Sequence, residues 1–198
     1  MTEKQKMIEG LAYQANDKEL VKERLYAKKE LKKFNDSEVQ HVKQRKLILK
    51  QLFGESDANF YVEPPFRCDY GYNIFIGDNF YANYNLTILD CAKVSIGRNV
   101  MFGPNISLFT AGHPIHFEPR NAGWEYAYPI SIGDNVWIGG CTVVNPGVNI
   151  GENVVIGSGS VVTKDIPSNS VAVGNPCKVI RSISEEEKSY YFKDKVIE

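Results

Sequence analysis

The sequence predicts an all-β solenoid, a parallel β-helix of hexapeptide repeats, with a helical cap in front of it. Three observations predict this fold. Long charged side chains dominate the first 53 residues and thin out from Phe60 onward. From there, Gly or Asn recurs beside single aliphatic residues. These aliphatic residues fall six positions apart, six times in a row: Ile132, Ile138, Val144, Ile150, Ile156 and Val162.

A period of six suits one short strand followed by one turn, with a single aliphatic side chain pointing inward in each repeat. Gly and Asn supply the turn conformations that other residues resist. Three such sides close a triangular coil of about 18 residues, and stacked coils pair their strands in parallel at ~4.8 Å. The sequence holds four copies of one corner: IGDN at 76–79, IGRN at 96–99, IGDN at 132–135 and IGEN at 150–153.

Two interruptions break the period. The phase slips by two residues between Ile88 and Ile96. Leu108 and Ile132 lie 24 residues apart, which is four periods, yet positions 114, 120 and 126 are Pro, Arg and Tyr. None of these suits the aliphatic column, so we expect an excursion at about 110–129, with the coils on either side stacking as though it were absent. The hand of the coil does not follow from these arguments, and the general rule favours right-handed parallel crossovers.

Two helices are predicted before the repeats. The first runs from about Asp17 to Phe34, with Asn16 as its N-cap. The second starts near Ser37, where SEVQ has the pattern of a capping box. Its predicted apolar face consists of Val39, Val42, Leu49 and Phe53. The expected parts of the chain are a helical cap (1–57), the β-helix (58–181) and a short C-terminal helix or tail (182–198).

Composition excludes several classes of protein. Hydrophobic residues make up 43% and charged residues 24% of the 198 residues, as in a soluble globular protein. No apolar run approaches the ~20 residues that cross a membrane, and the N-terminus lacks the apolar core of a signal peptide, so we expect a cytoplasmic protein that binds no membrane. The net charge of -1 gives no basic bias toward nucleic acid. The four cysteines form no CxxC pair, which favours reduced, mostly buried thiols over zinc or disulfides.

Several longer stretches carry a resemblance to a family. They are FRCDYGYNIFIGDNFYAN (66–83), TAGHPI (110–115), IGDNVWIGG (132–140), VVNPGVNIGENVVIGSGSVVTKDIP (143–167) and VGNPCKVIR (173–181). These stretches resemble the maltose and galactoside O-acetyltransferases, which belong to the hexapeptide-repeat acyltransferases. KMIEGLAY and RLYAKKELKKFN look like the helical cap of the sugar acetyltransferases, so the resemblance runs from about Lys6 to Phe192. FRCDYGYN leans toward the maltose-type branch.

The resemblance implies a left-handed β-helix and a homotrimer, with acetyl-CoA bound in grooves between neighbouring subunits. It implies transfer of the acetyl group to a hydroxyl of a sugar, such as maltose, glucose or a galactoside. Some hexapeptide proteins instead bind zinc through three histidines. This chain has three histidines in all, and His41 lies in the helical region, so we expect no metal site.

Acetyl transfer to a hydroxyl needs a base for the proton and hydrogen-bond donors for the developing oxyanion. Imidazole suits the first role because its unperturbed pKa of ~6.5 lies near neutral pH. The resemblance identifies His113, in TAGHPI, as the base, and His116 is expected to have a structural role or to lie at the rim of the site. Asn83 matches a family position near the reacting acetyl group, and the backbone at Ala82 is a candidate oxyanion donor. The alternative is that Asn83 is simply a corner residue, since coil corners favour Asn.

The resemblance also assigns contacts with acetyl-CoA. Small residues at coil corners would let the pantetheine arm run close to the backbone, and cations would bind the phosphates. Lys178 stands where relatives often have Arg, which weakens a bidentate phosphate contact. The alternative for each position is an ordinary exposed residue. The assigned residues are Asn83, Gly140, Ser158, Thr163, Lys164, Lys178 and Arg181.

The match loosens at the acceptor pocket. Asp69 matches a family position that contacts the acceptor. Cys91 stands where the galactoside enzymes have an acidic acceptor contact, and Ala15 likewise replaces an acidic residue, so galactoside specificity is not implied. Asp90 and Glu125 are available carboxylates to which the sequence assigns no role.

The sequence is also compatible with two other functions. One is an antibiotic or serine O-acetyltransferase on the same scaffold. Antibiotic enzymes share the histidine loop, but the N-terminal cap resembles that of the sugar enzymes. The other is a non-catalytic solenoid used for assembly, which would need neither the His113 loop nor the cationic tail.

Overall fold

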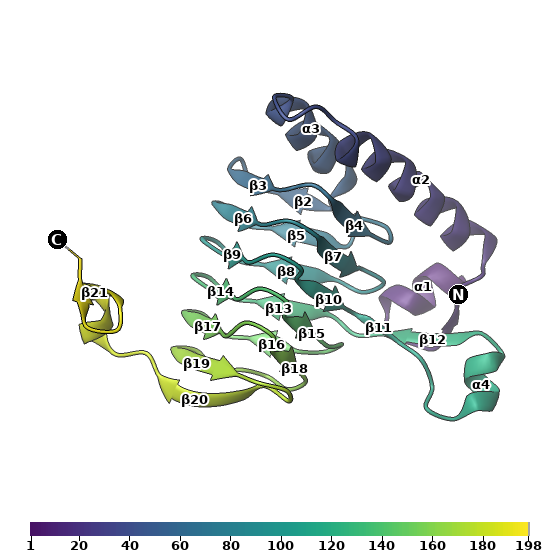
Figure 1. The fold of residues 1–198 in the computed structure, drawn as a ribbon. Coiled ribbons are helices and arrows are strands. Elements are labelled where there is room, and N and C mark those ends of the chain that lie inside the picture. The colour runs from purple at the N-terminus through teal and green to yellow at the C-terminus, as the bar shows by residue number, and fades with distance from the viewer. Residues whose placement is uncertain (198) are drawn as a thin grey trace.

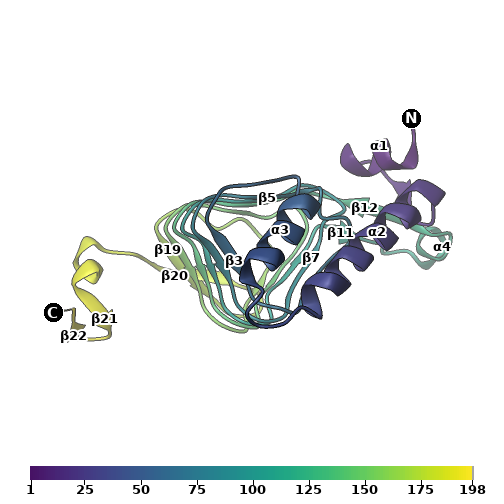
Figure 2. The ribbon, with the colours of Figure 1, turned by 90° about the horizontal axis from the view of Figure 1, so that it is seen from above.

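The structure is a computed structural model that describes residues 1–197. Helices α2 (Lys18–Asn35) and α3 (Val42–Leu52) lie across one end of a stack of β coils, and α1 (Glu3–Ile8) lies beside the stack (Figure 1). Viewed along the stack, successive coils superimpose as a rounded triangle (Figure 2). The repeat predicted this solenoid, and the helical patterns before it predicted the cap.

Three sheets form the sides of the coil, and each is a ladder of short parallel strands from successive turns. The first contains β4 (Phe66–Cys68), β7 (Leu86–Leu89), β10 (Ser107–Phe109), β15 (Val143–Val144) and β18 (Val161–Val162). The second contains β2 (Glu55–Ser56), β5 (Ile74–Ile76), β8 (Val94–Ile96), β13 (Ile130–Ile132) and β16 (Asn149–Ile150). The third contains β3 (Phe60–Val62), β6 (Phe80–Ala82), β9 (Met101–Phe102), β14 (Trp137–Ile138), β17 (Val154–Ile156), β19 (Ser170–Val173) and, antiparallel at its end, β20 (Lys178–Ser182).

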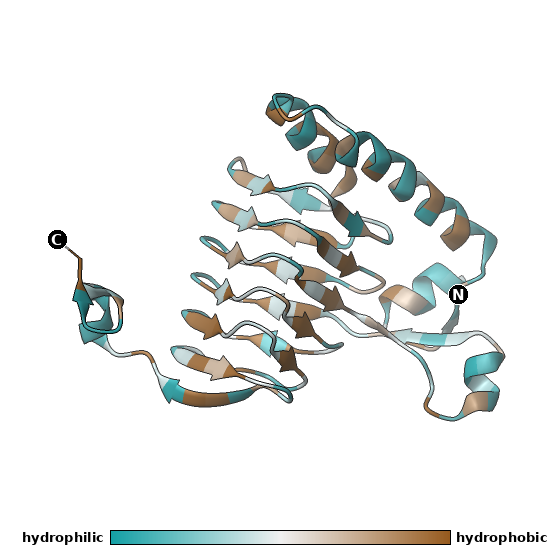
Figure 3. Ribbon diagram, viewed as in Figure 1, coloured by the Kyte–Doolittle hydropathy of each residue, from teal (hydrophilic) through white to brown (hydrophobic). Residues whose placement is uncertain are grey.

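The core is the predicted aliphatic column. Ile132 pairs with Ile150 and Val144 with Val162, so these coils repeat every 18 residues. All six residues of the predicted series are buried. Apolar residues recur on the strands of successive coils (Figure 3), which buries them without any long apolar segment.

Asparagine fixes one line of coil corners through its backbone conformation. Asn79, Asn99 and Asn135 have φ of 58°, 55° and 59°, in the left-handed region that Asn tolerates better than most residues. The Asn79 amide donates to the Asn99 side-chain oxygen at 3.0 Å, and Asn99 donates to Asn135 at 3.1 Å. The corners at 76–79, 96–99 and 132–135 are therefore stabilised both by the backbone conformation of Asn and by a ladder of side-chain amide bonds.

The phase slip has a structural cause. Cys68 pairs with Ile88 and Ile76 pairs with Ile96, so these coils contain 20 residues rather than 18. The two additional residues lie at the corner between the first and second sheets. We call the segments 69–73 and 90–93 the extended corners.

The cap differs from its prediction in three ways. The chain forms an additional helix, α1, and α2 is capped by Asp17 rather than Asn16, with Asp17 Oδ1 accepting from Glu19 N at 2.9 Å. The second predicted helix starts at Val42 instead of Ser37, because the Ser37 hydroxyl bonds Phe34 O and Arg45 Nε. Its predicted apolar face is wrong in part, since the face that α3 buries consists of Arg45, Ile48, Leu49 and Leu52.

The excursion at 110–129 has the predicted position. Leu108 pairs with Val144 across it, so the coils stack as though it were absent. The excursion contains β11 (Ala111–Gly112), α4 (Phe117–Asn121) and β12 (Trp124–Ala127). Its β12 pairs with β1 (Tyr13–Gln14), which ties the loop to the N-terminal segment of the same chain.

The C-terminal segment holds a short 3-10 helix where a short helix was expected. It spans Glu185–Ser189 and is followed by a hairpin of β21 (Tyr190–Phe192) and β22 (Lys195–Val196), which projects away from the coils (Figure 1). Within residues 1–197, no helix combines the length and the apolar character needed to cross a membrane.

Candidate active site

The predicted site residues lie mainly along two edges of the triangular coil. The Asn83 edge consists of the corners at 83–85, 103–105, 139–141 and 157–159, which follow strands of the third sheet. The His113 edge consists of the extended corners, the excursion at 110–129 and the corners at 145–148 and 163–165, which follow strands of the first sheet.

Small residues line the Asn83 edge. The Asn83 N–H donates to Phe102 O at 3.0 Å, and its side-chain oxygen accepts from Tyr84 N at 2.8 Å. Gly140 and Ser158 lie on the next coils of this edge, joined by the bond from Gly159 N to Gly140 O at 2.9 Å. The Ala82 side chain is buried in the core, so only its backbone could reach a reactant.

His113 follows β11 at the start of the excursion, and its side chain is exposed. A Cβ at Gly112 would lie 2.5 Å from the Tyr126 ring, so glycine leaves room for that ring beside the histidine. His116 has a different environment. Its Nδ1 accepts from Glu118 N at 3.3 Å at the start of α4, and its ring stacks on Phe117.

Asp69 and Cys91, the two predicted acceptor residues, meet on the extended corners. The Cys91 thiol donates to Asp69 Oδ2 at 3.6 Å. Burial is the main cause that raises the pKa of the Asp69 carboxyl above its ordinary value, and it raises that of the Cys91 thiol as well. The thiol therefore stays neutral near neutral pH, and the pair carries at most one negative charge.

Three further residues, Tyr13, Arg24 and Tyr70, surround this pair, and the sequence did not single them out for the site. The Tyr13 hydroxyl donates to Glu125 Oε2 at 2.9 Å across the β1–β12 pairing. Arg24 donates to the Tyr70 hydroxyl and to Ala15 O, both at 2.6 Å. Glu125, left without a role by the sequence, is thus held by Tyr13. A two-residue strand such as β1 has no periodicity to reveal this contact.

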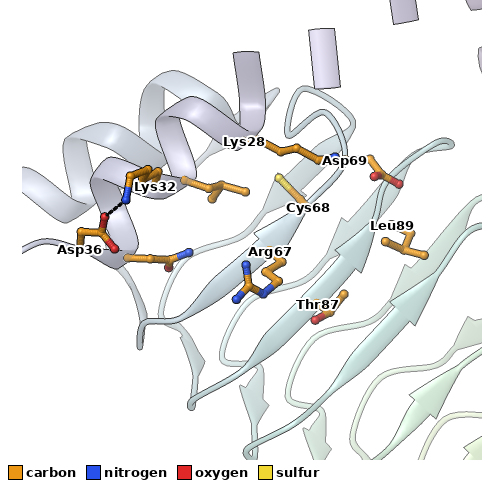
Figure 4. Close-up of a pocket in the computed structure, with 10 residues that line it drawn as sticks. Lys28, Lys32, Asp36, Arg67, Cys68, Asp69, Thr87 and Leu89 are labelled. Carbon is orange, nitrogen blue, oxygen red and sulfur yellow. Dashed lines mark hydrogen bonds and ion pairs between the residues drawn. The ribbon is translucent and has the colours of Figure 1, made fainter. Parts of the chain in front are cut away.

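A cavity of about 520 Å³ opens beside Asp69, between α2 and the first sheet (Figure 4). Lys28 extends from α2 toward Asp69, and Arg67 projects from β4 on the other side. Lys32 is paired with Asp36 at the far end. The cavity therefore places positive charge next to the Asp69 carboxylate.

The other residues predicted to contact acetyl-CoA are exposed and lie at separate places on the coil. Thr163 and Lys164 lie on the His113 edge, immediately after β18. Lys178 pairs with Val173 at the end of β20 nearest the Asn83 edge. Arg181 forms a two-point ion pair with Glu187, with both N–O distances 2.8 Å.

Asn83 and His113 are well separated within the chain. The strands of the first sheet run from the Asn83 edge to the His113 edge, and β7, which follows the Asn83 corner, has four residues. Four extended residues span about 13 Å. The excursion that carries His113 also projects away from the coils (Figure 2). One reacting group therefore cannot contact both side chains of a single chain.

No group of three or more His, Cys, Asp or Glu side chains in residues 1–197 is arranged to hold a metal ion. Over the same residues all four cysteines are free thiols, and three of them are buried. The exception is Cys141, which is exposed and has φ of 61° at a corner where the preceding coils carry Asn85 and Asn105.

Comparison with known proteins identifies the family. The profile described as "Maltose acetyltransferase hexapeptide capping motif" matches residues 6–57, and "Bacterial transferase hexapeptide (six repeats)" matches residues 129–164. The chain is 52% identical to the galactoside O-acetyltransferase of Escherichia coli K12, over 90% of this chain and 88% of that protein. The chain belongs to the maltose/galactoside O-acetyltransferase family. A putative acetyltransferase of Saccharomyces cerevisiae is 53% identical over 92% of this chain and 94% of that protein.

Solved structures of this family agree with the fold in detail. A maltose O-acetyltransferase from Clostridium difficile 630 is 56% identical, with a TM-score of 0.91 over 93% of this chain and 99% of that one. A galactoside acetyltransferase in complex with coenzyme A is 48% identical, with a TM-score of 0.96 over 100% and 99%. The coil is thus the left-handed β-helix of the family, and the protein is an acetyltransferase.

Proposed function

We propose that the protein transfers the acetyl group of acetyl-CoA to a hydroxyl of a sugar. The observation that carries this proposal is the whole-chain similarity to a galactoside acetyltransferase that holds coenzyme A. Higher identity to a maltose O-acetyltransferase supports a maltose- or glucose-like acceptor. So does the pairing of Asp69 with the neutral Cys91 thiol rather than with a second carboxylate.

His113 acts as the general base in this proposal. Its exposure at the root of the excursion supports the role, since the ring is free to approach a reactant on a neighbouring subunit. The acceptor oxygen forms a bond to the acetyl carbon while the carbon–sulfur bond breaks. The hydroxyl proton passes to His113 and from there to the departing sulfur, which leaves as the CoA thiol. The Asn83 side chain and the backbone at Ala82 orient the thioester and stabilise the oxyanion.

The reaction requires more than one subunit. Since Asn83 and His113 lie on different edges, a homotrimer with the Asn83 edge of one subunit against the His113 edge of the next would bring them together. The same contact would join Gly140, Ser158 and Lys178 of one subunit to Thr163 and Lys164 of another around one acetyl-CoA. Glycine-rich corners suit the pantetheine arm, and the two lysines suit the phosphates. Arg181 would join them only by releasing Glu187.

The test follows release of the CoA thiol from acetyl-CoA in the presence of maltose, glucose, a galactoside, serine and antibiotics. We expect release with a sugar, and loss of release in His113→Ala but not in the control His116→Ala. Preference for serine or an antibiotic would replace the sugar proposal with one of the alternative acetyltransferases. No release with any acceptor would favour the scaffold, and release that survives His113→Ala would overturn the assignment of the base.

A further inference from the structure

Asp90 is a fully buried carboxylate on the second extended corner. Its Oδ1 accepts from the backbone N–H of Asp69 at 3.0 Å and of Tyr70 at 2.9 Å. Its Oδ2 accepts from Gly71 N at 2.6 Å. One side chain therefore binds three consecutive amides of the other extended corner.

Among the described residues of the 18-residue coils, the nearest counterpart is Asp165 on the same edge, whose carboxylate accepts only one backbone amide, from Asn149 N at 2.8 Å. There a corner joins its neighbours mainly through backbone bonds from one coil to the next, such as Asn145 N to Val162 O at 3.0 Å. At the extended corner, the amides of residues 69–71 turn toward Asp90 instead. Gly71 has φ of +85°, a conformation that favours glycine. The Asn73 side chain fixes Asp90 itself by donating to its backbone oxygen at 2.7 Å.

The turn held in this way orients the Asp69 side chain toward Cys91, the other predicted acceptor residue. Asp69 is the first of the three residues whose amides bind Asp90, and its carboxylate meets the Cys91 thiol, which follows Asp90 in the chain. The corner that carries Asp90 thus fixes the backbone of Asp69. It also fixes the position of Cys91, the residue opposite the Asp69 carboxylate. A shift of the 69–71 turn would move the Asp69 carboxylate directly.

We infer that Asp90 is a positioning residue, whose carboxylate holds the 69–71 turn so that Asp69 is oriented toward the acceptor hydroxyls. The inference rests on the proposed function for the role of Asp69. The clamp on the turn stands on the geometry alone. Asp90 does not touch a reactant, since its oxygens are enclosed by the backbone of the turn.

The test uses Asp90→Asn, which keeps the shape of the side chain but replaces one accepting oxygen with a donating NH₂ group. If the NH₂ group replaces Oδ2, Gly71 N loses its partner, and if it replaces Oδ1, the amides of Asp69 and Tyr70 lose theirs. Asp134→Asn is the matched control. The Asp134 carboxylate also accepts a backbone amide at a coil corner, from Arg98 N at 2.8 Å, but on another edge of the coil. Both variants are compared with the unaltered protein as full-length chains.

Kinetics provide the first readout. We expect Asp90→Asn to raise the acceptor KM about tenfold, the effect of losing one hydrogen bond to a charged group, while the acetyl-CoA KM stays within twofold. Asp134→Asn should change neither KM. An acceptor KM that stays unchanged in Asp90→Asn would overturn the inference. A loss of kcat with both KM values unchanged would overturn it as well, because that result would indicate a merely structural role for Asp90.

Amide hydrogen exchange provides a second readout that needs no activity. In Asp90→Asn the amides of residues 69–71 should exchange at least about tenfold faster, while corners on the other edges keep their protection. Uniform acceleration, or none, would contradict the clamp. If the unaltered protein acetylates no sugar, the proposed function fails, and the exchange data still decide whether Asp90 holds the turn.

A gentler variant covers the case in which Asp90→Asn does not fold. Asn73→Ala removes only the bond that fixes the Asp90 backbone oxygen and leaves the carboxylate in place. We expect the same selective faster exchange at 69–71 and a rise in the acceptor KM of about threefold. Normal exchange at the turn with a normal acceptor KM would refute the inference.

Discussion

Asp69 and Cys91 face one another from two consecutive coils, with 3.6 Å between the thiol sulfur and the carboxylate oxygen. Both belong to corners that are two residues longer than those of the regular coils. The extended corners therefore account for the phase slip in the repeat and also hold the buried Asp90 and the Asp69–Cys91 pair. The β-helix departs from its period at the edge where it carries the proposed chemistry.

Asp69 is expected to contribute to acceptor binding rather than to folding. In Asp69→Asn the side chain keeps its size but loses its charge, so its bonds to sugar hydroxyls weaken. We predict an acceptor KM about tenfold higher and an acetyl-CoA KM within twofold of the unaltered value, measured by CoA release. Asp78→Asn is the control, since Asp78 accepts from Asn59 N at a corner on a different edge. An acetyl-CoA KM that rises in parallel would place Asp69 elsewhere in the mechanism.

The aliphatic column sets the stability of the coils. Ile138 is fully buried, and Ile138→Ala should lower the free energy of unfolding by about 2–5 kcal/mol through lost burial and the cavity that remains. Met101→Ala is the control, because Met101 points outward on β9 and is 53% exposed. Urea unfolding at one fixed protein concentration measures both effects. Equal losses would show that the column does not dominate the core.

At the corner asparagines, we expect a glycine variant to be more stable than an alanine variant, which is the reverse of the usual order. Asn135 has φ of 59°, so Asn135→Ala and Asn135→Gly both remove its side-chain bond but differ in their tolerance of this conformation. We predict that the alanine variant is less stable than the glycine variant by about 1 kcal/mol. Thermal or urea unfolding decides it, and an alanine variant as stable as the glycine variant would argue against a fixed left-handed corner.

Burial raises the pKa of Asp90 to about 6, against the opposing effect of the amides that bind it. The charge of Asp69 raises it further, while Cys68, Tyr72 and Cys91 stay neutral near neutral pH because burial raises their pKa as well. A folded-state pKa above the unfolded value of ~3.9 means that the folded protein binds this proton more tightly.

The Asp90 contribution to stability is therefore greatest below pH ~4 and is lost as pH rises through about 6. At pH 7 the buried charge costs about 3 kcal/mol relative to a carboxylate with an unshifted pKa. The measurement is the difference in unfolding free energy between the unaltered protein and Asp90→Asn from pH 4 to pH 7. We expect the unaltered protein to lose stability relative to the variant across this range. A difference that is independent of pH would contradict the raised pKa.

The repeat allowed most of the solenoid to be predicted. An aliphatic residue every six positions requires one inward side chain per side, so the core column and the position of the excursion followed from spacing alone. Motif resemblance added the hand, and it matched Asp69 and Cys91 to one pocket, where the structure brings them together. The roles assigned to His113 and His116 remain predictions; the structure adds that the His113 side chain is exposed and that His116 caps α4, which the sequence did not indicate.

Contacts between distant short segments could not be predicted. β1 has two residues, too few for any period, yet it supports β12 and places Tyr13 against Glu125. The predicted start of the second helix was wrong because the Ser37 hydroxyl bonds Arg45 and the end of α2 instead of capping a helix. Asp90 had no assigned role because its partners are backbone amides, which carry no signature in the sequence.

In the proposed trimer, one catalytic centre takes Asn83 from one subunit and His113 from the next. The direct test mixes Asn83→Ala with His113→Ala, each inactive alone, by refolding equal amounts together, and confirms mixed trimers by native mass spectrometry. Random assembly around a threefold axis would restore an intact centre at about one quarter of all sites, so we predict about a quarter of the unaltered rate of CoA release. Mixed trimers without activity would contradict the shared site.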